Sequence, residues 1–157
     1  MTWTQSNLAT QGYCLSGEEA RALRFGVRFP TALCLLLVLA GLALESALII
    51  ALLVPIGAVA GWTRRHPFDL IWNHGLRRLV RAPELPPNPT RRRHAFKLAT
   101  VWIAGVAVLF AVGADTAGLA AGVVLVAVCL LVTVTSFCVP STILAWLEMR
   151  RRERATV

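Results

Sequence analysis

Apolar residues dominate four long stretches of this chain, at about residues 27–44, 47–62, 98–113 and 118–146. Runs of this length with almost no charge are typical of helices that cross a bilayer, whose hydrocarbon core is about 30 Å thick. In lipid, only helices and closed barrels satisfy every backbone polar group. The pattern therefore predicts an all-α integral membrane protein with four transmembrane helices, and we expect residues 1–157 to form a single membrane domain.

The short polar breaks between these stretches predict how the helices are paired. Glu45–Ser46 is the only polar interruption between the first two stretches, and residues 113–118, which hold Asp115, separate the last two. Each of the first two stretches covers about 26 Å at ~1.5 Å per residue, which favours two separate crossings over one long helix. We therefore predict two helical hairpins joined by a loop of residues 63–97.

The loop between the hairpins contains an amphipathic pattern. In residues 67–81, apolar side chains recur at the helical period, while Asp69 and several arginines occupy much of the other side. Pro67 suits a first helical turn, Asp69 the positive end of the helix dipole and the arginines its negative end. The segment is predicted to be an in-plane helix at the cytoplasmic membrane surface, with Trp72 and Leu76 facing lipid.

The remaining segments are polar or rich in proline. Residues 1–15 are mixed in character and are expected to form a mobile cytoplasmic tail. Ser16 and Glu19 fit the capping box that starts a helix, so we expect a helix to begin there. Four prolines within residues 82–89 predict a stiff, extended connector, after which Thr90 begins the third long helix.

Composition supports the membrane assignment, and the distribution of charge adds an orientation. The chain is 57% hydrophobic with a mean hydropathy of +0.66, which exceeds the usual values of a soluble domain. Its sixteen basic residues lie in three places, with three in residues 21–28 at the start of the first stretch, nine in residues 63–97 and four after residue 149. The positive-inside rule then places both termini and the loop in the cytoplasm, which predicts a multi-pass protein of the plasma membrane. We expect no cleavable signal peptide, because the first basic residue is Arg21.

Candidate chemistry is concentrated near the end of the fourth stretch. Pro140 removes a backbone hydrogen bond and clashes with the carbonyl of Ser136, so another group must satisfy that carbonyl. If the helix breaks there, Cys138 reaches the cytoplasmic boundary; if it continues, Cys138 lies in the inner half of the bilayer. The candidate catalytic residues are Cys138, Ser141 and Cys34, and an approach of Cys34 to Cys138 stays open. A cysteine that only packs is the favoured alternative.

Other kinds of site are disfavoured by spacing and position. The arginine clusters lie at the ends of spans, where topology requires positive charge, so we expect contact with anionic lipid and not with nucleic acid. No spacing typical of metal ligands occurs, and no metal or cofactor is expected. Small residues at Gly57-x-x-x-Gly61 and Gly118-x-x-x-Gly122 are expected to pack helices closely, which is compatible with a homo-oligomer. The predicted lipid or interface residues are Trp72, Arg77, Arg78, Arg81, Arg91, Arg92 and Arg93.

Several short motifs together resemble a known family of bacterial membrane proteins. They are Arg24-Phe25 at the first span, Pro67 after the second, Arg93-His94-Ala95-Phe96 before the third and Phe137-Cys138 at the end of the fourth. In these motifs the chain is similar to the family called domain of unknown function 4395, over residues 16–146.

This resemblance carries its own implications for chemistry. Many members of the family have a second cysteine near the position of Ser141, so this chain resembles a variant with Cys-x-x-Ser in place of a Cys-x-x-Cys-like ending. The resemblance implies thiol or sulfur chemistry with a cytoplasmic thioredoxin-type or sulfurtransferase partner. Because Ser141 replaces the second cysteine, such chemistry would need another thiol or a single thiolate.

These observations lead to three functional hypotheses in order of preference. The first is an accessory or interaction protein of the membrane, which is not an enzyme. The second is a thiol-redox or sulfur-handling membrane protein centred on Cys138. A small transporter comes third, because Glu45 and Asp115 fall at turns and leave no carboxylate within a span to serve as an ion site.

Overall fold

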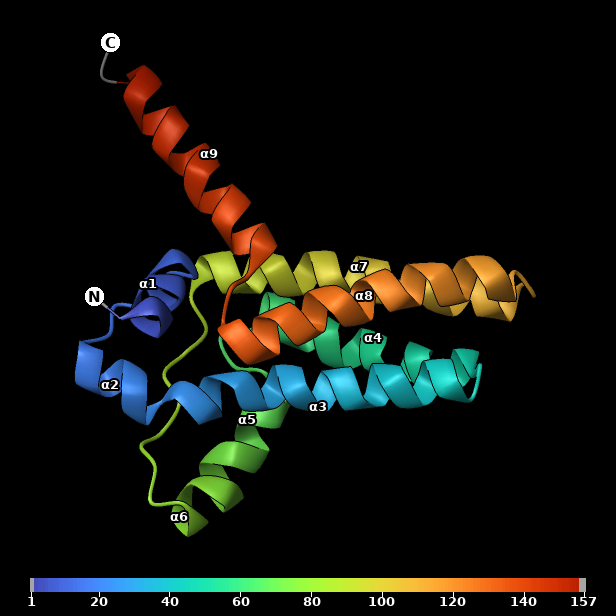
Figure 1. The fold of residues 1–157 in the computed structure, drawn as a ribbon, viewed down its shortest axis with the longest axis horizontal. Coiled ribbons are helices and arrows are strands. Elements are labelled where there is room, and N and C mark those ends of the chain that lie inside the picture. Colours follow the sequence, from blue (N-terminus) through green and yellow to red (C-terminus); the bar gives the residue numbers. More distant parts are fainter. Residues whose placement is uncertain (1, 156–157) are drawn as a thin grey trace.

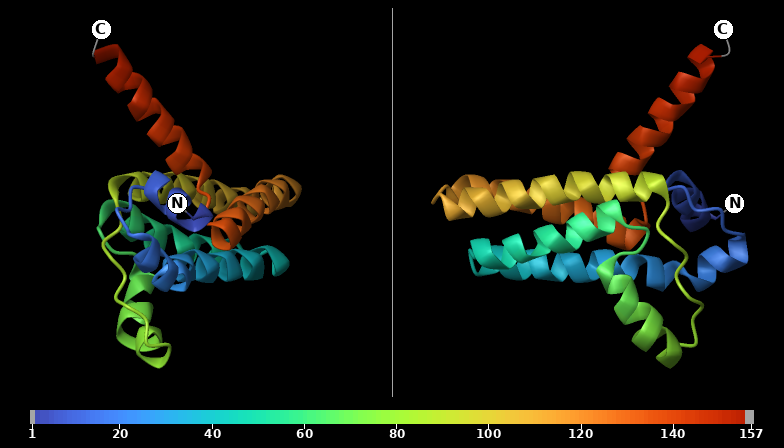
Figure 2. Two further views of the ribbon diagram at one scale, coloured as in Figure 1. Left: turned by 60° about the vertical axis from the view of Figure 1, so that its left-hand side comes forward. Right: turned by 180° about the vertical axis from the view of Figure 1, so that it is seen from behind.

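The computed structural model describes residues 2–155, and the regular elements in this part of the chain are all helices, without strands. Four long helices run side by side, while the last helix and a short helical segment leave the bundle on opposite sides near one of its ends (Figures 1 and 2). The elements are α1 (Trp3–Thr10), α2 (Gly17–Ala22), α3 (Arg24–Ala43), α4 (Ala47–Trp62), α5 (Pro67–Ile71), the π-helical turn η1 (Trp72–Leu76), α6 (Arg77–Leu79), α7 (Thr90–Ala111), α8 (Asp115–Thr135) and α9 (Val139–Ala155).

Three helical segments are long and apolar enough to cross a membrane: Gly17–Ala43, Thr90–Ala111 and Asp115–Thr135. A fourth results if α4 is counted together with residues 67–79, from which it is separated by a bend of 82°. The all-helical class is therefore confirmed, and the apolar helices are compatible with a membrane protein. The division into a single domain stays a prediction.

The turn between α3 and α4 lies where the polar break predicts it. Glu45 has a positive φ of 47°, which reverses the chain after α3. The Ser46 side chain accepts a hydrogen bond from the backbone N–H of Ile49 at 3.4 Å and so caps the start of α4. The turn between α7 and α8 is shorter than the predicted residues 113–118. Asp115 is already the first residue of α8, where the positive end of the helix dipole favours an acidic side chain.

Close packing of α4 against α7 depends on glycine. A Cβ atom at Gly57 would lie 2.4 Å from Thr100 Oγ1, and one at Gly61 would lie 2.7 Å from Lys97 Cγ. The Gly-x-x-x-Gly pair thus lets the two backbones approach, as expected for packing. The adjoining core is apolar and contains buried side chains from all four long helices, namely Val38, Leu42, Ile50, Leu53, Ile103, Val106, Ala107, Phe110 and Leu125.

The segment Pro67–Leu79, here called the lateral segment, differs from the predicted in-plane helix. It consists of α5, one π-helical turn and α6, and it turns Trp72 toward the protein. Trp72 is 6% exposed and packs on Phe29, with ring centroids 5.7 Å apart. A Cβ atom at Gly26 would lie 2.7 Å from the Trp72 ring, so glycine is needed on the facing helix.

The expectation that Trp72 faces lipid is therefore wrong. The helical spacing is right to place Trp72 and Leu76 on one face, but that face packs against a protein cluster that includes Leu8, Val27 and Leu85. Leu76 is partly buried against the same cluster as Trp72. The large apolar side chains that the lateral segment and the residue after it leave exposed are Leu70, Ile71, Leu79 and Val80.

The amino-terminal segment is also more ordered than predicted. Residues 3–10 form α1, which lies beside the arginine-rich start of α7, and the expectation of a mobile tail is wrong. The capping box is confirmed, because Ser16 Oγ accepts from the Glu19 backbone N–H at 3.2 Å and the Glu19 carboxylate accepts from the Ser16 backbone N–H at 2.8 Å. Residues 82–89 contain no helix or strand, as predicted for the connector.

Candidate functional site

The fourth apolar stretch is broken into two helices. α8 ends at Thr135, and Ser136 has a left-handed backbone with φ 59° and ψ 13°. α9 starts at Val139, so Pro140 lies in its first turn, where a backbone N–H has no intrahelical partner to lose. The prediction of a span over residues 118–146 is therefore corrected, and of the two alternatives the broken helix is the one observed.

Polar side chains of α1 and of Gln11, the residue that follows it, cap the end of α8. Asn7 Nδ2 donates to the carbonyl of Thr135 at 3.0 Å, and Gln11 Nε2 donates to the carbonyl of Ser136 at 2.6 Å. Arg28 Nε donates to Ser136 Oγ at 2.9 Å. The Ser136 carbonyl is thus satisfied by an amide from the amino-terminal segment, a partner that the local sequence around Pro140 does not indicate.

Replacing Gln11 with leucine is expected to lower the free energy of unfolding by about 2 kcal/mol, because the Ser136 carbonyl would stay buried without a partner. Gln11 is only 3% exposed, so water cannot take its place. The measurement is thermal or denaturant unfolding of the detergent-purified protein. Gln5→Leu, on the helix that Gln11 follows, is the matched control. The amide of Gln5 binds Leu15 O at 3.2 Å in a partly exposed position, so a loss there as large as that of Gln11→Leu would contradict the cap.

Cys138 immediately precedes α9, and its carbonyl accepts the first hydrogen bond of that helix from Thr142 N at 3.0 Å. Ser141 Oγ donates to Cys138 Sγ at 3.2 Å, and Ser141 is fully buried. The structure thus brings together Cys138 and Ser141, two of the three candidate catalytic residues. Cys138 is only 9% exposed and lies in the wall of an apolar cavity of about 130 Å³, which is also lined by Cys129, Trp102 and Phe96.

Cys34 lies elsewhere, beside His66 and not beside Cys138. The distance from Cys34 Sγ to His66 Nε2 is 3.8 Å. His66 Nδ1 accepts a hydrogen bond from the Phe68 backbone N–H at 3.1 Å, so its proton is on Nε2 and points toward the sulfur. In this arrangement His66 cannot take a proton from Cys34. All four cysteines are free, and no disulfide joins Cys34 to Cys138.

His66 is neutral in the folded protein. Burial, and next the charge of Arg92, lower its pKa from 6.5 to about 3. The unfolded chain therefore binds a proton at His66 below about pH 6.5, while the folded protein does not until about pH 3. Titration of His66 therefore does not affect the free energy of unfolding above about pH 6.5. The free energy of unfolding decreases as the pH falls from 6.5 toward 3, by at most about 1.4 kcal/mol per pH unit.

We therefore expect His66→Asn to flatten the loss of stability with acid. Asparagine keeps a side-chain acceptor that can cap α5 but does not titrate. The free energy of unfolding of the wild-type protein should fall more steeply than that of His66→Asn between about pH 7 and pH 5. His74→Gln, at an exposed position, should retain the wild-type slope. Parallel curves for wild type and His66→Asn would show that His66 is not buried and neutral.

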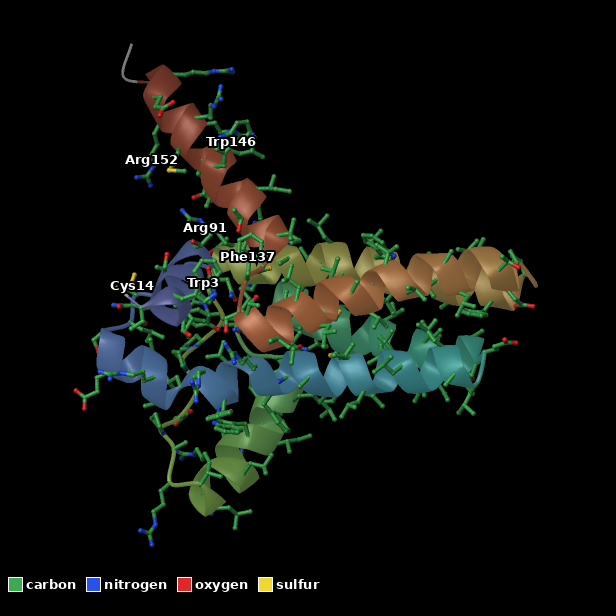
Figure 3. All side chains as sticks on the ribbon, viewed as in Figure 1. Trp3, Cys14, Arg91, Phe137, Trp146 and Arg152 are labelled. Carbon is green, nitrogen blue, oxygen red and sulfur yellow. The ribbon has the colours of Figure 1, made fainter. Side chains whose placement is uncertain are left out.

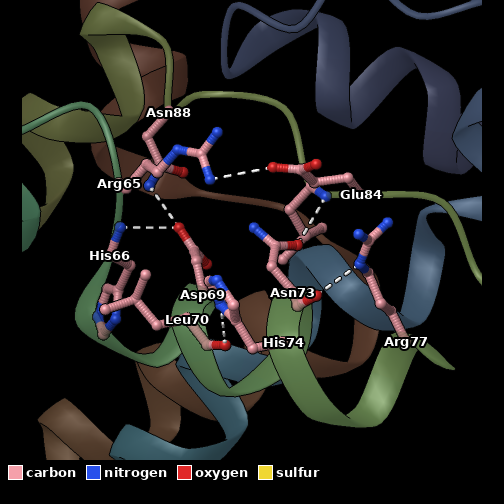
Figure 4. A network of polar contacts seen from close by, with 10 residues as sticks. Arg65, His66, Asp69, Leu70, Asn73, His74, Arg77, Glu84 and Asn88 are labelled. Carbon is pink, nitrogen blue, oxygen red and sulfur yellow. Dashed lines mark hydrogen bonds and ion pairs between the residues drawn. The ribbon is translucent and has the colours of Figure 1, made fainter. Parts of the chain in front are cut away.

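A buried polar network surrounds His66 and joins distant parts of the chain (Figure 4). Asp69 Oδ2 accepts from the His66 backbone N–H at 2.7 Å and from Asn88 Nδ2 at 3.2 Å. Tyr13 OH donates to Asn88 Oδ1 at 2.9 Å. Burial raises the pKa of Asp69, although these hydrogen bonds and Arg92 act against the shift. The network fixes the connector and α5 against the segment that follows α1.

Arg92 completes this network, and the prediction that it lies at the lipid interface is wrong. Its guanidinium donates to Tyr13 OH at 3.0 Å and to the carbonyl of Val27 at 2.7 Å, and it lies over the Phe96 ring at 5.4 Å. Arg92 is 5% exposed, so it holds α7 to α3 and cannot reach lipid headgroups. A run of three arginines in the sequence gives no sign that its middle member points inward.

The other arginines that were predicted to lie at the lipid interface differ in whether their side chains are free to reach lipid headgroups. Arg91 is paired with Glu148 at 2.6 Å, and Arg93 donates to the carbonyl of Trp62 at 3.0 Å. Arg77 is partly buried and donates to the Asn73 carbonyl. Of the seven, Arg78 and Arg81 are the exposed ones; Arg78 lies near the end of the lateral segment and Arg81 lies just beyond it.

These features define a small helical protein with long apolar helices and a polar, arginine-rich layer at one end. The chain belongs to the family described as Domain of unknown function (DUF4395), whose model matches residues 24–149. The resemblance found in the sequence is thereby confirmed. The match includes Cys34, His66 and Cys138 and leaves out α1, which caps α8. No curated protein and no solved structure matches the chain.

Proposed function

We propose that this protein crosses the bacterial inner membrane four times, with both termini and residues 63–97 in the cytoplasm. The segregation of charge along the bundle carries this proposal. Glu45, in one turn, and Asp115, the first residue of α8, lie at one end of the bundle, while all sixteen basic residues belong to segments at or near the other end (Figure 1). Positive charge is retained on the cytoplasmic side of membrane proteins, which gives the orientation.

In this proposal α4 crosses the membrane alone. Its 16 residues cover about 24 Å, which a slight local thinning of the bilayer accommodates. The bend of 82° then directs the lateral segment along the membrane surface. Exposed Leu79 and Val80 would enter the acyl boundary, and exposed Arg78 and Arg81 would meet the headgroups.

The function that this arrangement supports best is that of a non-enzymatic accessory protein. It would present exposed arginines to anionic lipid and to a cytoplasmic protein partner. The surroundings of two cysteines favour a non-enzymatic function, because Cys138 is buried and His66 cannot act as a base toward Cys34. A reactive thiol needs both access and a lowered pKa.

A thiol function centred on Cys138 is the second candidate, and one observation favours it. The sulfur lies at the start of α9 and accepts a hydrogen bond from Ser141, an arrangement that would also stabilise a thiolate. A cytoplasmic thioredoxin-type or sulfurtransferase partner would then be the redox or sulfur partner. Access would have to come through the apolar cavity beside Cys138.

Co-purification separates the two candidates. We expect detergent-extracted wild-type protein to retain anionic phospholipid and a cytoplasmic protein, identified by mass spectrometry. Arg78→Gln/Arg81→Gln should lose the protein partner and retain less anionic phospholipid, whereas Cys138→Ala should keep both at the wild-type level. Loss from Cys138→Ala with retention by the arginine variant would reject the accessory function in favour of the thiol function.

A further inference from the structure

α9 extends away from the four long helices and leaves much of its surface uncovered. It begins at the joint after Ser136 and points to the side of the bundle opposite the lateral segment (Figures 1 and 2). Ile143, Trp146 and Leu147 are 52%, 48% and 42% exposed and lie at positions i, i+3 and i+4, on one face. An apolar face of this kind is unusual on a helix that stands in water.

The charge on α9 changes along its length. Residues 139–147 carry no charge, and residues 148–154 then hold four arginines, at positions 150, 151, 152 and 154, and two glutamates, Glu148 and Glu153. Glu148 is paired with Arg91 of α7, so the arginines are in excess on the outer part of α9. Figure 3 shows Trp146 and Arg152 on the outward-pointing part of the helix. The order of aliphatic side chains, tryptophan and then arginine matches the change from acyl chains to headgroups across a membrane surface.

A shallow groove of about 160 Å³ lies where these two zones meet. It is lined by Trp146, Leu147, Arg150, Arg151 and Arg154. The Arg150 guanidinium lies over the Trp146 ring at 4.6 Å, which holds a cation at the edge of the apolar surface. The groove therefore combines an apolar floor with three cationic side chains, and guanidinium groups are suited to phosphate because of their paired N–H donors.

We propose that this groove binds the phosphate of an anionic phospholipid, with Trp146 and Leu147 in contact with its acyl chains. α9 is then a second membrane-surface anchor, placed opposite the lateral segment. A free phosphate would leave the apolar floor exposed, and a soluble acidic protein would have to cover it from the aqueous side. The inference rests on the proposed membrane embedding, because the lipid must come from the bilayer that holds the spans.

The test uses the full chain in Cys14→Ser form, with an environment-sensitive fluorophore on Leu147→Cys. The protein is reconstituted in phosphatidylcholine vesicles with or without phosphatidylglycerol. We expect a blue shift and a gain in emission when phosphatidylglycerol is present, and the loss of both in Arg150→Gln/Arg151→Gln/Arg154→Gln. Arg21→Gln/Arg24→Gln/Arg64→Gln, three exposed arginines elsewhere, should leave the response unchanged.

A second label separates failure of this inference from failure of the embedding. Val124 lies on α8 and is 50% exposed, so a fluorophore on Val124→Cys should report an apolar environment in both kinds of vesicle. An apolar signal at position 124 without a lipid-dependent signal at 147 would overturn the α9 site alone. An aqueous signal at position 124 would overturn the embedding, and reversal of the signal at 147 by inorganic phosphate would show a site for free phosphate instead.

Discussion

Arg92→Met is expected to lower the free energy of unfolding by about 4 kcal/mol, one of the two largest effects that the structure predicts. The substitution removes two hydrogen bonds made by a buried charge, each worth about 1.5–3 kcal/mol. It leaves the Val27 carbonyl and the Tyr13 hydroxyl without their donor. Lysine should not rescue the loss, because a single ammonium group cannot reproduce the fork of the guanidinium.

Arg78→Met is the matched control for this prediction. Arg78 is exposed at the end of the lateral segment, and its replacement should change stability by no more than about 0.5 kcal/mol. Both variants can be compared by thermal unfolding in the same detergent. Equal stability of Arg92→Met and Arg78→Met would mean that Arg92 lies at the surface, as the arginine run alone suggests.

Trp72→Ala is expected to lower the free energy of unfolding by a similar amount, about 3–5 kcal/mol, because it removes a large buried side chain. The ring fills the space between Phe29 and Gly26 and belongs to a cluster with Leu8, Tyr13 and other apolar residues. Its Nε1 has no hydrogen-bond partner among the described residues. Trp72→Phe should therefore be mild, because it keeps most of the packing and removes an unsatisfied donor.

Leu79→Ala provides the comparison for Trp72. Leu79 lies on the same lateral segment but is 82% exposed, so its truncation should leave the stability in detergent nearly unchanged. Unfolding temperatures of the three variants give the ranking. A larger loss for Leu79→Ala than for Trp72→Ala would restore the predicted lipid-facing position of Trp72.

The long helices could be predicted because their signal is local. A run of apolar residues in lipid must be helical, and breaks such as Glu45–Ser46 mark the turns. For the fourth stretch, Pro140 left two alternatives, a helix that breaks there or one that continues, and the local sequence does not distinguish them. The deciding contacts come from Asn7 and Gln11, which lie 128 and 125 residues away from the carbonyls that they cap.

Partners that are remote in the sequence also explain why the order of residues 3–10 and the burial of Arg92 were not predicted. Residues 3–10 have no apolar face of their own, and they are held as a helix against α8 by side-chain amides. Arg92 looks like its neighbours Arg91 and Arg93 until its partners Tyr13 and Val27 are known. The inward position of Trp72 depends on partners that are distant in the sequence, such as Leu8, Gly26 and Phe29.

The four-span arrangement is tested most directly by labelling engineered cysteines from outside intact bacterial cells with a membrane-impermeant maleimide. In a Cys14→Ser background, Glu45→Cys and Asp115→Cys should react from outside. Arg81→Cys should react only after the membrane is permeabilised, because α4 crosses alone and returns the chain to the cytoplasm. Reaction of Arg81→Cys in intact cells, or protection of Glu45→Cys, would contradict the arrangement.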